Sequence, residues 1–347
     1  MKRTMAVIDG TGRVYARAED FPPPAENEVT LAVHASLISP GTEMMLVKQR
    51  RAKPETEEKI NPFGYSCAGE ITAIQGDGHG LRVGMRVAAM GGGAKHADKV
   101  HVPVNLVTPL PDDVSFEQGT YACLGATALQ AVIRTAPLLG EFGLVAGLGI
   151  VGNLTAQLCL LGGARVLAWE GLAGRRERAR QCGIAHACDP ADNAGVDAAR
   201  EFAAPYGMDF AVMAFGGEAT EAYRQILQVM KLSADGHRMG RITLVGGCHV
   251  TVRGGAGGGN TELRWASRTG PGYHDDAWEH GADYPAAFVP FDTQRNLREI
   301  VCLMAEKRLL VTPMTTHRIP LQQVGEAADL LLEQPDQAQG ILLTKSS

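Results

Sequence analysis

The chain has 347 residues, is 45% hydrophobic and carries a formal net charge of −5 at pH 7. This length favours two domains and leaves ample material for buried cores. The acidic balance argues against a strongly basic face for nucleic acid, and the apolar runs are interrupted well short of a membrane span. We therefore expect a protein that acts on a small molecule, with neither nucleic acid nor a membrane as its partner.

The cysteines and the N-terminal residues indicate the cellular compartment in which we expect the protein. The seven cysteines form no C-x-x-C pair, and most lie in apolar runs. Their positions are Cys67, Cys123, Cys159, Cys182, Cys188, Cys248 and Cys302. Such usage is typical of reduced, buried thiols. The N-terminal residues lead into an alternating strand and a turn at Asp9-Gly10, without the apolar core of a signal peptide. Both features predict a cytoplasmic protein.

The first ~120 residues are β-rich by run length and alternation. Apolar residues alternate with other residues over 29–36, and short strands are predicted around 68–74, 86–90 and 99–102. Ser115, with Gln118 three residues later, has the pattern of a capping box and predicts a helix that continues through Cys123 and Ala131.

From Phe142 onward the pattern changes to alternating strands and helices, which predicts a parallel, doubly wound sheet. The predicted strands are 143–149, 164–170, 185–189, 208–215 and 240–246, with helices between them, for example at 219–232. The glycine-rich stretch 253–259 is interpreted as a flexible surface loop in preference to a functional lid. A helix at 292–307 closes this region. The tail 312–347 adds a strand, a helix at 322–332 and a last strand at 340–344.

A glycine motif lies at the first strand-to-helix turn of this alternating region. Gly147, Gly149 and Gly152 form G-x-G-x-x-G after a buried strand, and a second strand ends in Glu170. In a dinucleotide-binding unit the first glycine permits the tight turn, the second lets the pyrophosphate approach the backbone, and the third lets the helix pack on the strand. The exposed N–H groups at the helix start would then bind the pyrophosphate.

Glu170 bears on the choice of cofactor. An acid at this position accepts hydrogen bonds from the adenosine ribose hydroxyls and repels a 2′-phosphate, so it favours NAD over NADP. Arg175 and Arg176 argue mildly in the other direction, although both are also explained as solvated charges on the next helix. The candidate cofactor-binding residues are Gly147, Gly149, Ile150, Val151, Gly152, Glu170, Arg175, Thr127 and Gly246.

The whole chain resembles the medium-chain dehydrogenase/reductase superfamily, the zinc-type alcohol dehydrogenase-like proteins. The similar segments are 39–43, 64–70, 83–87, the glycine motif and 316–321. The segments 36–43, 124–130, 270–275, 283–285 and 294–296 resemble more narrowly a zinc-lacking subgroup, which includes bacteriochlorophyllide dehydrogenases and the N-terminal halves of two-domain sugar oxidoreductases. The resemblance implies an α/β protein with a GroES-like β-rich catalytic domain and a Rossmann domain. We assign 1–122 to the catalytic domain, 123–311 to the Rossmann domain and 312–347 to the return to the catalytic domain.

The resemblance fails at the metal. Zinc-dependent relatives have Cys-Gly-Thr-Asp where this chain has Pro40 to Glu43, and Gly-His-Glu where it has Gly64-Tyr65-Ser66. Only the third ligand position, Cys123, still holds a cysteine. Catalytic zinc needs about three protein ligands, and the cluster of four closely spaced cysteines for structural zinc is also missing. We therefore expect no metal.

Without a metal, hydrogen-bond donors must stabilise the oxygen that becomes alkoxide-like during hydride transfer. Tyr65 stands at a former ligand position, and its phenol would serve as acid or base if its pKa fell. Thr42 matches a hydroxyl that relays protons in relatives, and His274 is a second candidate because imidazole titrates near neutral pH. Each also has a purely structural interpretation, as a packed ring, a turn hydroxyl or a loop residue.

The stretch 268–295 is rich in polar rings and charges that would suit a hydroxyl-rich ligand. The candidate substrate-binding residues are Glu43, Arg268, Tyr273, Asp275, Trp278 and Tyr284. A solvated or interface loop is the alternative.

The leading interpretation is an NAD(H)-dependent oxidoreductase that acts on a secondary alcohol or ketone of a sugar- or cyclitol-like substrate, as a homodimer by analogy with the superfamily. Three alternatives stay open. They are an NADPH-dependent enone or quinone reductase, a lyase that retains NAD and uses transient oxidation, and a non-catalytic dinucleotide sensor.

Overall fold

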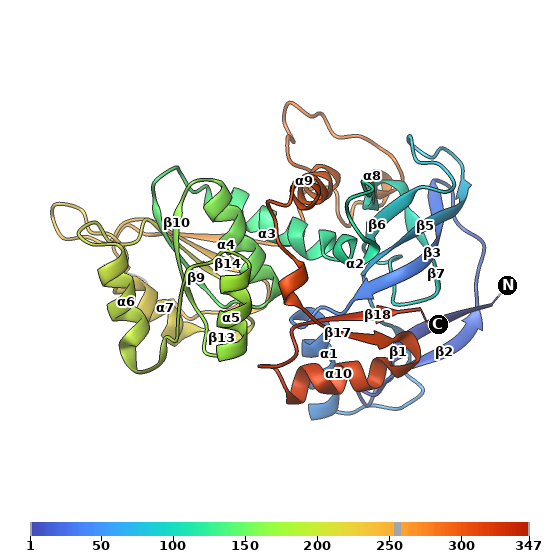
Figure 1. The fold of residues 1–347 in the computed structure, drawn as a ribbon, viewed down its shortest axis with the longest axis horizontal. Coiled ribbons are helices and arrows are strands. Elements are labelled where there is room, and N and C mark those ends of the chain that lie inside the picture. Colours follow the sequence, from blue (N-terminus) through green and yellow to red (C-terminus); the bar gives the residue numbers. More distant parts are fainter. Residues whose placement is uncertain (1, 253–257, 346–347) are drawn as a thin grey trace. The chain divides into compact units, whose positions relative to one another are not determined.

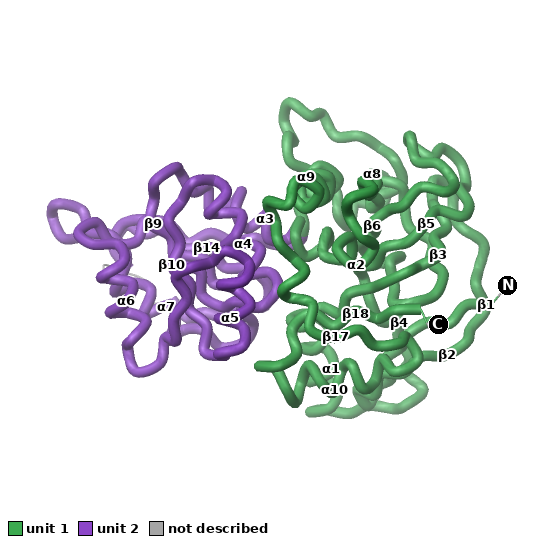
Figure 2. Tube along the Cα trace, viewed as in Figure 1, with its two compact units in different colours: residues 1–126, 269–347 green, residues 127–268 purple. Residues whose placement is uncertain are grey.

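The computed structural model describes residues 2–252 and 258–345, and the chain separates into two compact units (Figure 2). The first unit contains Met1–Ala126 and Thr269–Ser347, and the second contains Thr127–Arg268. These limits differ from the predicted boundaries at 122/123 and 311/312. The larger difference is at the second boundary, because residues 269–311 belong to the first unit.

Hydrogen bonds from two asparagine side chains explain why this segment belongs to the first unit. The Nδ2 atom of Asn105 donates to the backbone carbonyls of Trp278, at 2.6 Å, and Ala282, at 3.3 Å. Asn27 donates in the same way to the carbonyl of His280, at 2.9 Å. Carbonyl groups in loops need donors when they are shielded from water. The segment therefore depends on side chains of the first unit, a dependence that strand and helix periodicity does not reveal.

Among the described residues, the first unit contains a seven-stranded sheet in the order β17-β18-β3-β5-β6-β8, with β7 also paired to β3 (Figure 1). The strands are β3 (Glu28–Leu37), β5 (Ser66–Gln75), β6 (Arg86–Met90), β7 (Lys99–Pro103), β8 (Val107–Pro109), β17 (Thr315–Pro320) and β18 (Gly340–Thr344). A second sheet joins β2 (Val14–Asp20), β1 (Lys2–Ile8) and β4 (Asn61–Pro62). The predicted alternation is confirmed in β3, where Val29, Leu31 and Val33 are buried and His34 is exposed.

Helices cover parts of these sheets. The described helices of this unit are α1 (Thr42–Ala52), α2 (Phe116–Gly119), α8 (Asp276–Glu279), α9 (Thr293–Ala305) and α10 (Val324–Glu333), together with the start of α3 (Ala122–Thr135). The predicted capping box is confirmed: the Ser115 hydroxyl accepts from the Gln118 amide, and the Gln118 side chain accepts from the Ser115 amide. The helix that it starts is short, and α3 begins after a break.

The second unit contains a six-stranded parallel sheet in the order β11-β10-β9-β12-β14-β16 (Figure 1). The strands are β9 (Phe142–Ala146), β10 (Arg165–Trp169), β11 (His186–Cys188), β12 (Phe210–Met213), β14 (Arg241–Val245) and β16 (Glu262–Ala266). A small parallel pair, β13 (Gly217–Glu218) and β15 (Cys248–His249), accompanies it. The strand order reverses direction between β9 and β12. This is the arrangement of a doubly wound dinucleotide-binding sheet, whose ligands bind beyond the carboxyl ends of the strands at that reversal.

Helices bury both faces of this sheet. Residues of α6 (Ala194–Phe202) and α7 (Thr220–Leu227) share one core with Leu144 and Met213. Residues of α3, α4 (Ile150–Leu161) and α5 (Ala173–Gln181) share the other core with Val145 and Val166. Neighbouring residues of one strand therefore face opposite helix layers. The predicted α/β class, with a β-rich part and a doubly wound parallel sheet, is confirmed.

Several details differ from the sequence prediction. The sixth strand, β16, and helix α1 were not predicted. The predicted helix 219–232 ends at Leu227 in α7, and Met230 forms a bridge with Met208 instead. Most of the predicted loop 253–259 lies outside the described residues. In the part of the chain that the structure describes, no helix combines the length and the apolar character needed to cross a membrane.

Candidate functional site

The glycine turn between β9 and α4 is a close backbone contact. Gly147 has φ +92°, a left-handed conformation that favours glycine. A Cβ atom on Gly152 would lie 1.8 Å from the Gly147 carbonyl oxygen, so no larger residue fits there. A Cβ atom on Gly149 would meet only the Arg175 guanidinium, at 4.0 Å, among the described residues. The turn is thus closed on its inner side and open on its outer side, where a phosphate can approach the helix start.

Glu170 is buried beside this turn, with 8% of its surface exposed. One carboxylate oxygen accepts a hydrogen bond from the Leu148 amide, at 2.8 Å, and the other accepts from the Leu172 amide, at 3.0 Å. Leu148 is the residue between the first two glycines of the motif. The carboxylate that was singled out from the sequence therefore shapes the turn itself, and its position beyond β10 is the one expected for a ribose-binding acid.

The two arginines that follow have different surroundings. Arg175 Nη1 lies 3.7 Å from a Glu170 carboxylate oxygen, at the open side of the turn. Arg176 donates to the backbone carbonyl of Glu170, at 2.6 Å, and forms an ion pair with Asp189, at 3.2 Å. Arg176 is thus committed to the loop, and Arg175 is the cation that lies close to the cofactor side.

The other candidate cofactor residues lie in the same unit. Ile150 and Val151 begin α4, Gly246 directly follows β14 with φ +72°, and Thr127 lies in the helix α3. Gly147 and Gly246 are therefore at the carboxyl ends of two parallel strands. This is the sheet edge at which ligands of such folds bind.

A second cluster of candidate residues lies in the first unit, around Tyr65. Tyr65 directly precedes β5, and Thr42 begins α1. Burial raises the pKa of the Tyr65 phenol well above its ordinary value, and the Cys123 thiol and the Glu43 carboxylate act in the same direction. Side-chain hydrogen bonds with Ser39 and Thr42 oppose this effect only in part. The pKa shift is opposite to the one that a base would need, so Tyr65 is a neutral hydrogen-bond donor at neutral pH.

Glu43 has a different role from the predicted one in substrate binding. Only 5% of its surface is exposed, because its carboxylate is taken up inside the unit. One oxygen accepts from the Ser39 amide, at 2.6 Å, and the other lies 3.2 Å from Nε2 of His96. Ser39 and His96 were not identified from the sequence. His96 lies in an irregular glycine-rich stretch without periodicity, so no pattern pointed to it.

Cys123 is a buried neutral thiol. Burial raises its pKa to about 12, Glu43 adds to this, and a hydrogen bond with Ser66 acts in the opposite direction. Its neighbour Cys67 is also fully buried, with a pKa of about 12. A thiol that stays protonated is neither a ready nucleophile nor a ready metal ligand.

The candidate residues of the stretch 268–295 separate into three groups. Tyr273 and His274 stack at a centroid distance of 3.9 Å, and His274 is exposed. Tyr273 is close to the Tyr65 segment, because a Cβ atom on Gly91 would lie 3.2 Å from its ring, and the Gly91 amide donates to the Tyr65 carbonyl. Tyr273 and Tyr65 therefore belong to one region of the first unit.

The other members have structural roles or lie elsewhere. Asp275 caps α8 and accepts from the Tyr284 hydroxyl at 2.5 Å. Trp278 is 2% exposed and packs under Gly272, so it is a core residue, in contrast to the predicted substrate contact. Arg268 belongs to the second unit. Tertiary packing therefore separates residues that are adjacent in the sequence.

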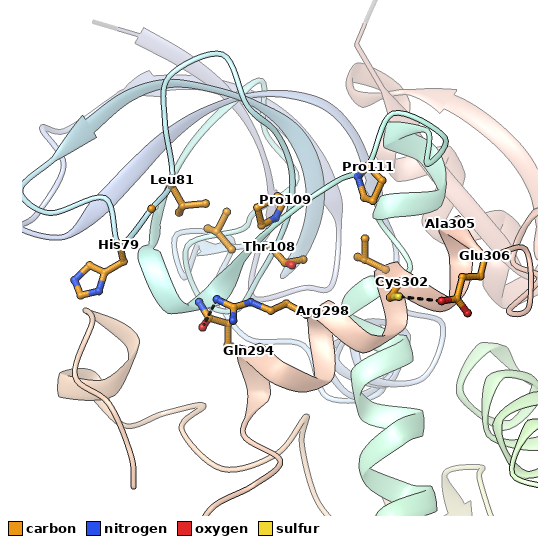
Figure 3. Close-up of a pocket in the computed structure, with 13 residues that line it drawn as sticks. His79, Leu81, Thr108, Pro109, Pro111, Gln294, Arg298, Cys302, Ala305 and Glu306 are labelled. Carbon is orange, nitrogen blue, oxygen red and sulfur yellow. Dashed lines mark hydrogen bonds between the residues drawn. The ribbon is translucent and has the colours of Figure 1, made fainter. Parts of the chain in front are cut away.

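A cavity of about 610 Å³ lies in the first unit, and none of the candidate residues lines it (Figure 3). Leu81, Pro109 and Pro111 form one wall, and residues of α9 from Gln294 to Glu306 form the other. Within it, Cys302 Sγ lies 3.4 Å from Glu306, and this hydrogen bond raises the pKa of the thiol.

No protein-family model matches the chain. Over 257 residues, the chain is 26% identical to the L-threonine 3-dehydrogenase of Pectobacterium carotovorum, which covers 65% of this chain and 72% of that protein. Over 168 residues, it is 29% identical to a phenolphthiocerol/phthiocerol polyketide synthase of Mycobacterium tuberculosis. That match covers 48% of this chain but only 8% of the synthase, so the chain spans a small part of that relative's length.

Solved structures show the same fold over the whole chain. An oxidoreductase of unknown specificity from Escherichia coli superposes with a TM-score of 0.81 at 17% identity and covers 100% of both chains. Two further structures have TM-scores of 0.75 and cover 99% of both chains. One is described as a short chain alcohol dehydrogenase from Escherichia coli complexed with NADH, at 15% identity. The other is described as a zinc-binding dehydrogenase from Sinorhizobium meliloti bound to NADP, at 17% identity. The relatives include a named dehydrogenase, and solved structures of an oxidoreductase and of dehydrogenases share the fold of this chain.

Proposed function

We propose that the protein is a zinc-independent oxidoreductase that transfers a hydride between NAD(H) and a secondary alcohol or ketone of a polyhydroxylated, sugar- or cyclitol-like substrate. The observation that carries the proposal is the Glu170 carboxylate, hydrogen-bonded to the glycine turn at the reversal point of the parallel sheet. The same carboxylate holds the turn and lies where a ribose-binding acid is expected in a dinucleotide-binding sheet.

The residues present fit a dinucleotide. The N–H groups at the start of α4 and the open side of Gly149 suit the pyrophosphate, and Glu170 suits the adenosine ribose hydroxyls. When bound, the nicotinamide supplies the hydride acceptor or donor. Arg175 lies close enough to Glu170 to contact either the pyrophosphate or a 2′-phosphate. This proximity is the observation that keeps an NADPH-dependent reductase as a second candidate.

The residues present do not fit zinc. The positions at which zinc-dependent relatives hold ligands are occupied by Pro40, Tyr65 and Cys123. Proline offers no side-chain donor, and both other groups are held in their neutral forms by burial. Among the described residues, no group of three or more His, Cys, Asp or Glu side chains is arranged to hold a metal. The proposed chemistry therefore uses no metal.

Tyr65 is the proposed donor to the substrate oxygen. In the direction of ketone reduction, negative charge develops on that oxygen as the hydride arrives, and a neutral phenol can donate a hydrogen bond and then a proton to it. Ser39 and Thr42, which interact with the phenol, would orient it. His274, exposed beside Tyr273, remains the alternative proton donor.

The substrate class rests on the polar groups near this region. The stacked rings of Tyr273 and His274 offer ring faces and polar atoms of the kind that bind hydroxyl-rich molecules, and the hydrogen-bonded Asp275 and Tyr284 would support this segment. A lyase that retains NAD, or a dinucleotide sensor, would use the same cofactor residues. Cofactor that stays bound after desalting would favour the lyase, and turnover of any substrate would eliminate the sensor.

We also propose a cytoplasmic homodimer. All seven cysteines are free thiols, as expected for a reducing compartment. In the described part of the sheet, β16 is an edge strand and exposes Trp265, 62% of whose surface is accessible. An edge strand with an exposed aromatic ring suits pairing with a second copy. A sedimentation mass of one chain at micromolar concentration would contradict the dimer.

The Glu170 carboxylate should make NAD(H) bind more tightly than NADP(H). Glu170→Ala should narrow or reverse the preference, by about tenfold or more, because the repulsion of the 2′-phosphate is lost. Glu170→Gln is the matched control for the turn, since its amide oxygen can still accept from the Leu148 amide. Calorimetric titration with both cofactors measures the effect. Tighter binding of NADPH by the unaltered protein would contradict the assignment.

Protein purified without chelators should contain no stoichiometric zinc by elemental analysis. The double variant Pro40→Cys with Tyr65→His restores a three-ligand set and should take up zinc, because the third position is already Cys123. One zinc per unaltered chain, lost together with activity on chelation, would show that the argument from the donor set is wrong.

Tyr65→Phe should reduce turnover by about 10²–10³-fold with little change in NAD affinity, because it removes a preorganised donor and keeps the ring. Tyr206→Phe, with 69% of the tyrosine exposed, is the control and should have no effect. Full turnover in Tyr65→Phe together with its loss in His274→Ala would transfer the acid role to His274.

The raised pKa of Tyr65 has a direct spectroscopic consequence. The phenolate absorbance of the unaltered protein and of Tyr65→Phe should titrate identically up to about pH 10, since Tyr65 remains protonated beyond the ordinary range of tyrosine. The rate of ketone reduction should accordingly show no loss from Tyr65 ionisation between neutral pH and that limit. A phenolate step near neutral pH that is absent from Tyr65→Phe would overturn the assignment of a neutral donor.

A further inference from the structure

A buried pair, Glu43 and His96, lies beside the turn that bears the groups around Tyr65. We propose that this pair is a positioning device: it anchors the turn 39–42 and thereby orients the Tyr65 hydroxyl for catalysis. The inference rests on the proposed function, because it assigns the pair a role in that reaction. Neither residue is proposed to contact the substrate.

The Glu43 carboxylate contacts both the Ser39 backbone and the His96 imidazole. Its carboxylate accepts the Ser39 amide through one oxygen, at 2.6 Å, and lies 3.2 Å from His96 Nε2 through the other. Glu43 is 5% exposed and His96 is 0% exposed. Among the described residues, the hydrogen bond from the Ser39 amide is the one that this carboxylate accepts. Its other oxygen is in close contact with the imidazole without the geometry of a hydrogen bond, and a carboxylate buried to this degree is stable only with such close partners. The position of the Ser39 backbone is therefore tied to the position of the imidazole.

The imidazole of His96 is itself held by the segment that carries Tyr65. Gly64 has φ +108°, and a Cβ atom on it would lie 2.3 Å from the His96 amide nitrogen and 2.7 Å from Cγ of the ring. The His96 amide donates to the Phe63 carbonyl, at 3.0 Å, and the two rings meet edge to face at 5.6 Å. The residue directly before Tyr65 thus packs against the imidazole without a side chain of its own.

These contacts close a loop of interactions around the phenol. From Tyr65 the path runs through Gly64 to His96, then to Glu43 and the Ser39 amide. Ser39 and Thr42, whose side chains lower the pKa of the Tyr65 phenol, lie on the turn that Glu43 anchors. A hydroxyl held from both sides in this way loses little orientational freedom during the reaction. Small displacements of a positioned catalytic group reduce rates by about 10²-fold.

The first test needs no substrate. Amide hydrogen exchange at Ser39 should become about 10–100-fold faster in Glu43→Ala, the range expected when a hydrogen bond to a charged acceptor is lost. His96→Phe, which fills the ring space without nitrogen atoms, should also accelerate it. Glu43→Gln keeps an acceptor for the Ser39 amide and should lie between the unaltered protein and Glu43→Ala.

The matched control is Asp98→Asn, two residues from His96. Asp98 also accepts a backbone amide, that of Thr4 at 2.9 Å, but it is not hydrogen-bonded to Glu43. It should change exchange at Thr4 and leave Ser39 within about twofold of the unaltered protein. If His96→Phe does not fold, Glu43→Gln against Asp98→Asn still decides the question, because neither change removes buried volume.

The second test uses turnover. His96→Phe should lower kcat by about 10²-fold with unchanged affinity for NAD(H), whose candidate ligands lie in the other unit. Added to Tyr65→Phe, it should lower kcat little further, because residues that act as a unit are not additive. Fully additive losses, or Ser39 exchange within twofold of the unaltered protein in both Glu43→Ala and Glu43→Gln, would overturn the proposal. If no substrate is turned over, the proposed function fails, while the exchange data still decide whether the anchor exists.

Discussion

The turn between β9 and α4 in the second unit depends on one constraint. This constraint is the close approach of the Gly152 position to the Gly147 carbonyl. A helix can begin this near to the end of a strand only when no side chain intervenes. Its first N–H groups then lie beyond the carboxyl end of β9, and the Glu170 carboxylate binds the Leu148 amide in the middle of the turn. The strand β9, the glycine turn, the start of α4 and the Glu170 carboxylate thus form one hydrogen-bonded arrangement. In the proposed function, cofactor binding depends on this whole arrangement and not on any single residue.

In the function that we propose, the first unit stabilises the developing charge without a metal. Zinc supplies a fixed positive charge, whereas a phenol supplies only a hydrogen bond and a proton. A weaker group must be positioned more accurately to be useful. The hydroxyls of Ser39 and Thr42 and the buried carboxylate of Glu43 surround Tyr65 in a way that meets this requirement. Burial also keeps the Tyr65 phenol and the Cys123 thiol neutral. Both groups therefore remain hydrogen-bond donors and do not become anions.

The segment 269–284 illustrates how side chains from distant positions define a unit. By its place in the chain it follows the last strand of the parallel sheet, yet Asn27 and Asn105 supply the donors for its carbonyl groups. The buried side chain of Trp278 anchors the segment 269–284 further in the core. The polar residues Tyr273 and His274 are therefore held close to the Tyr65 segment.

Local patterns were sufficient for the fold class and for the glycine turn with its neighbouring acid. The glycine spacing, the acid at the end of the second strand and the alternation of strands and helices are consequences of short-range geometry, and the residues concerned are separated by few positions in the chain. The identity of Tyr65 at a former ligand position was also readable from the sequence alone. The strand β16 and the helix α1 were missed because their apolar periodicity is weak.

Only the tertiary structure decided the environment of each candidate side chain. Glu43 and His96 are 53 positions apart in the sequence, and no pattern in either segment predicts their contact. Trp278 and Tyr273 have similar sequence surroundings, but one is core and the other is partly exposed. Even the direction of the Tyr65 pKa shift required the structure, because desolvation depends on every element that packs around the phenol. Sequence spacing determines which groups can form a turn or a helix face, whereas burial and long-range contacts determine what those groups do chemically.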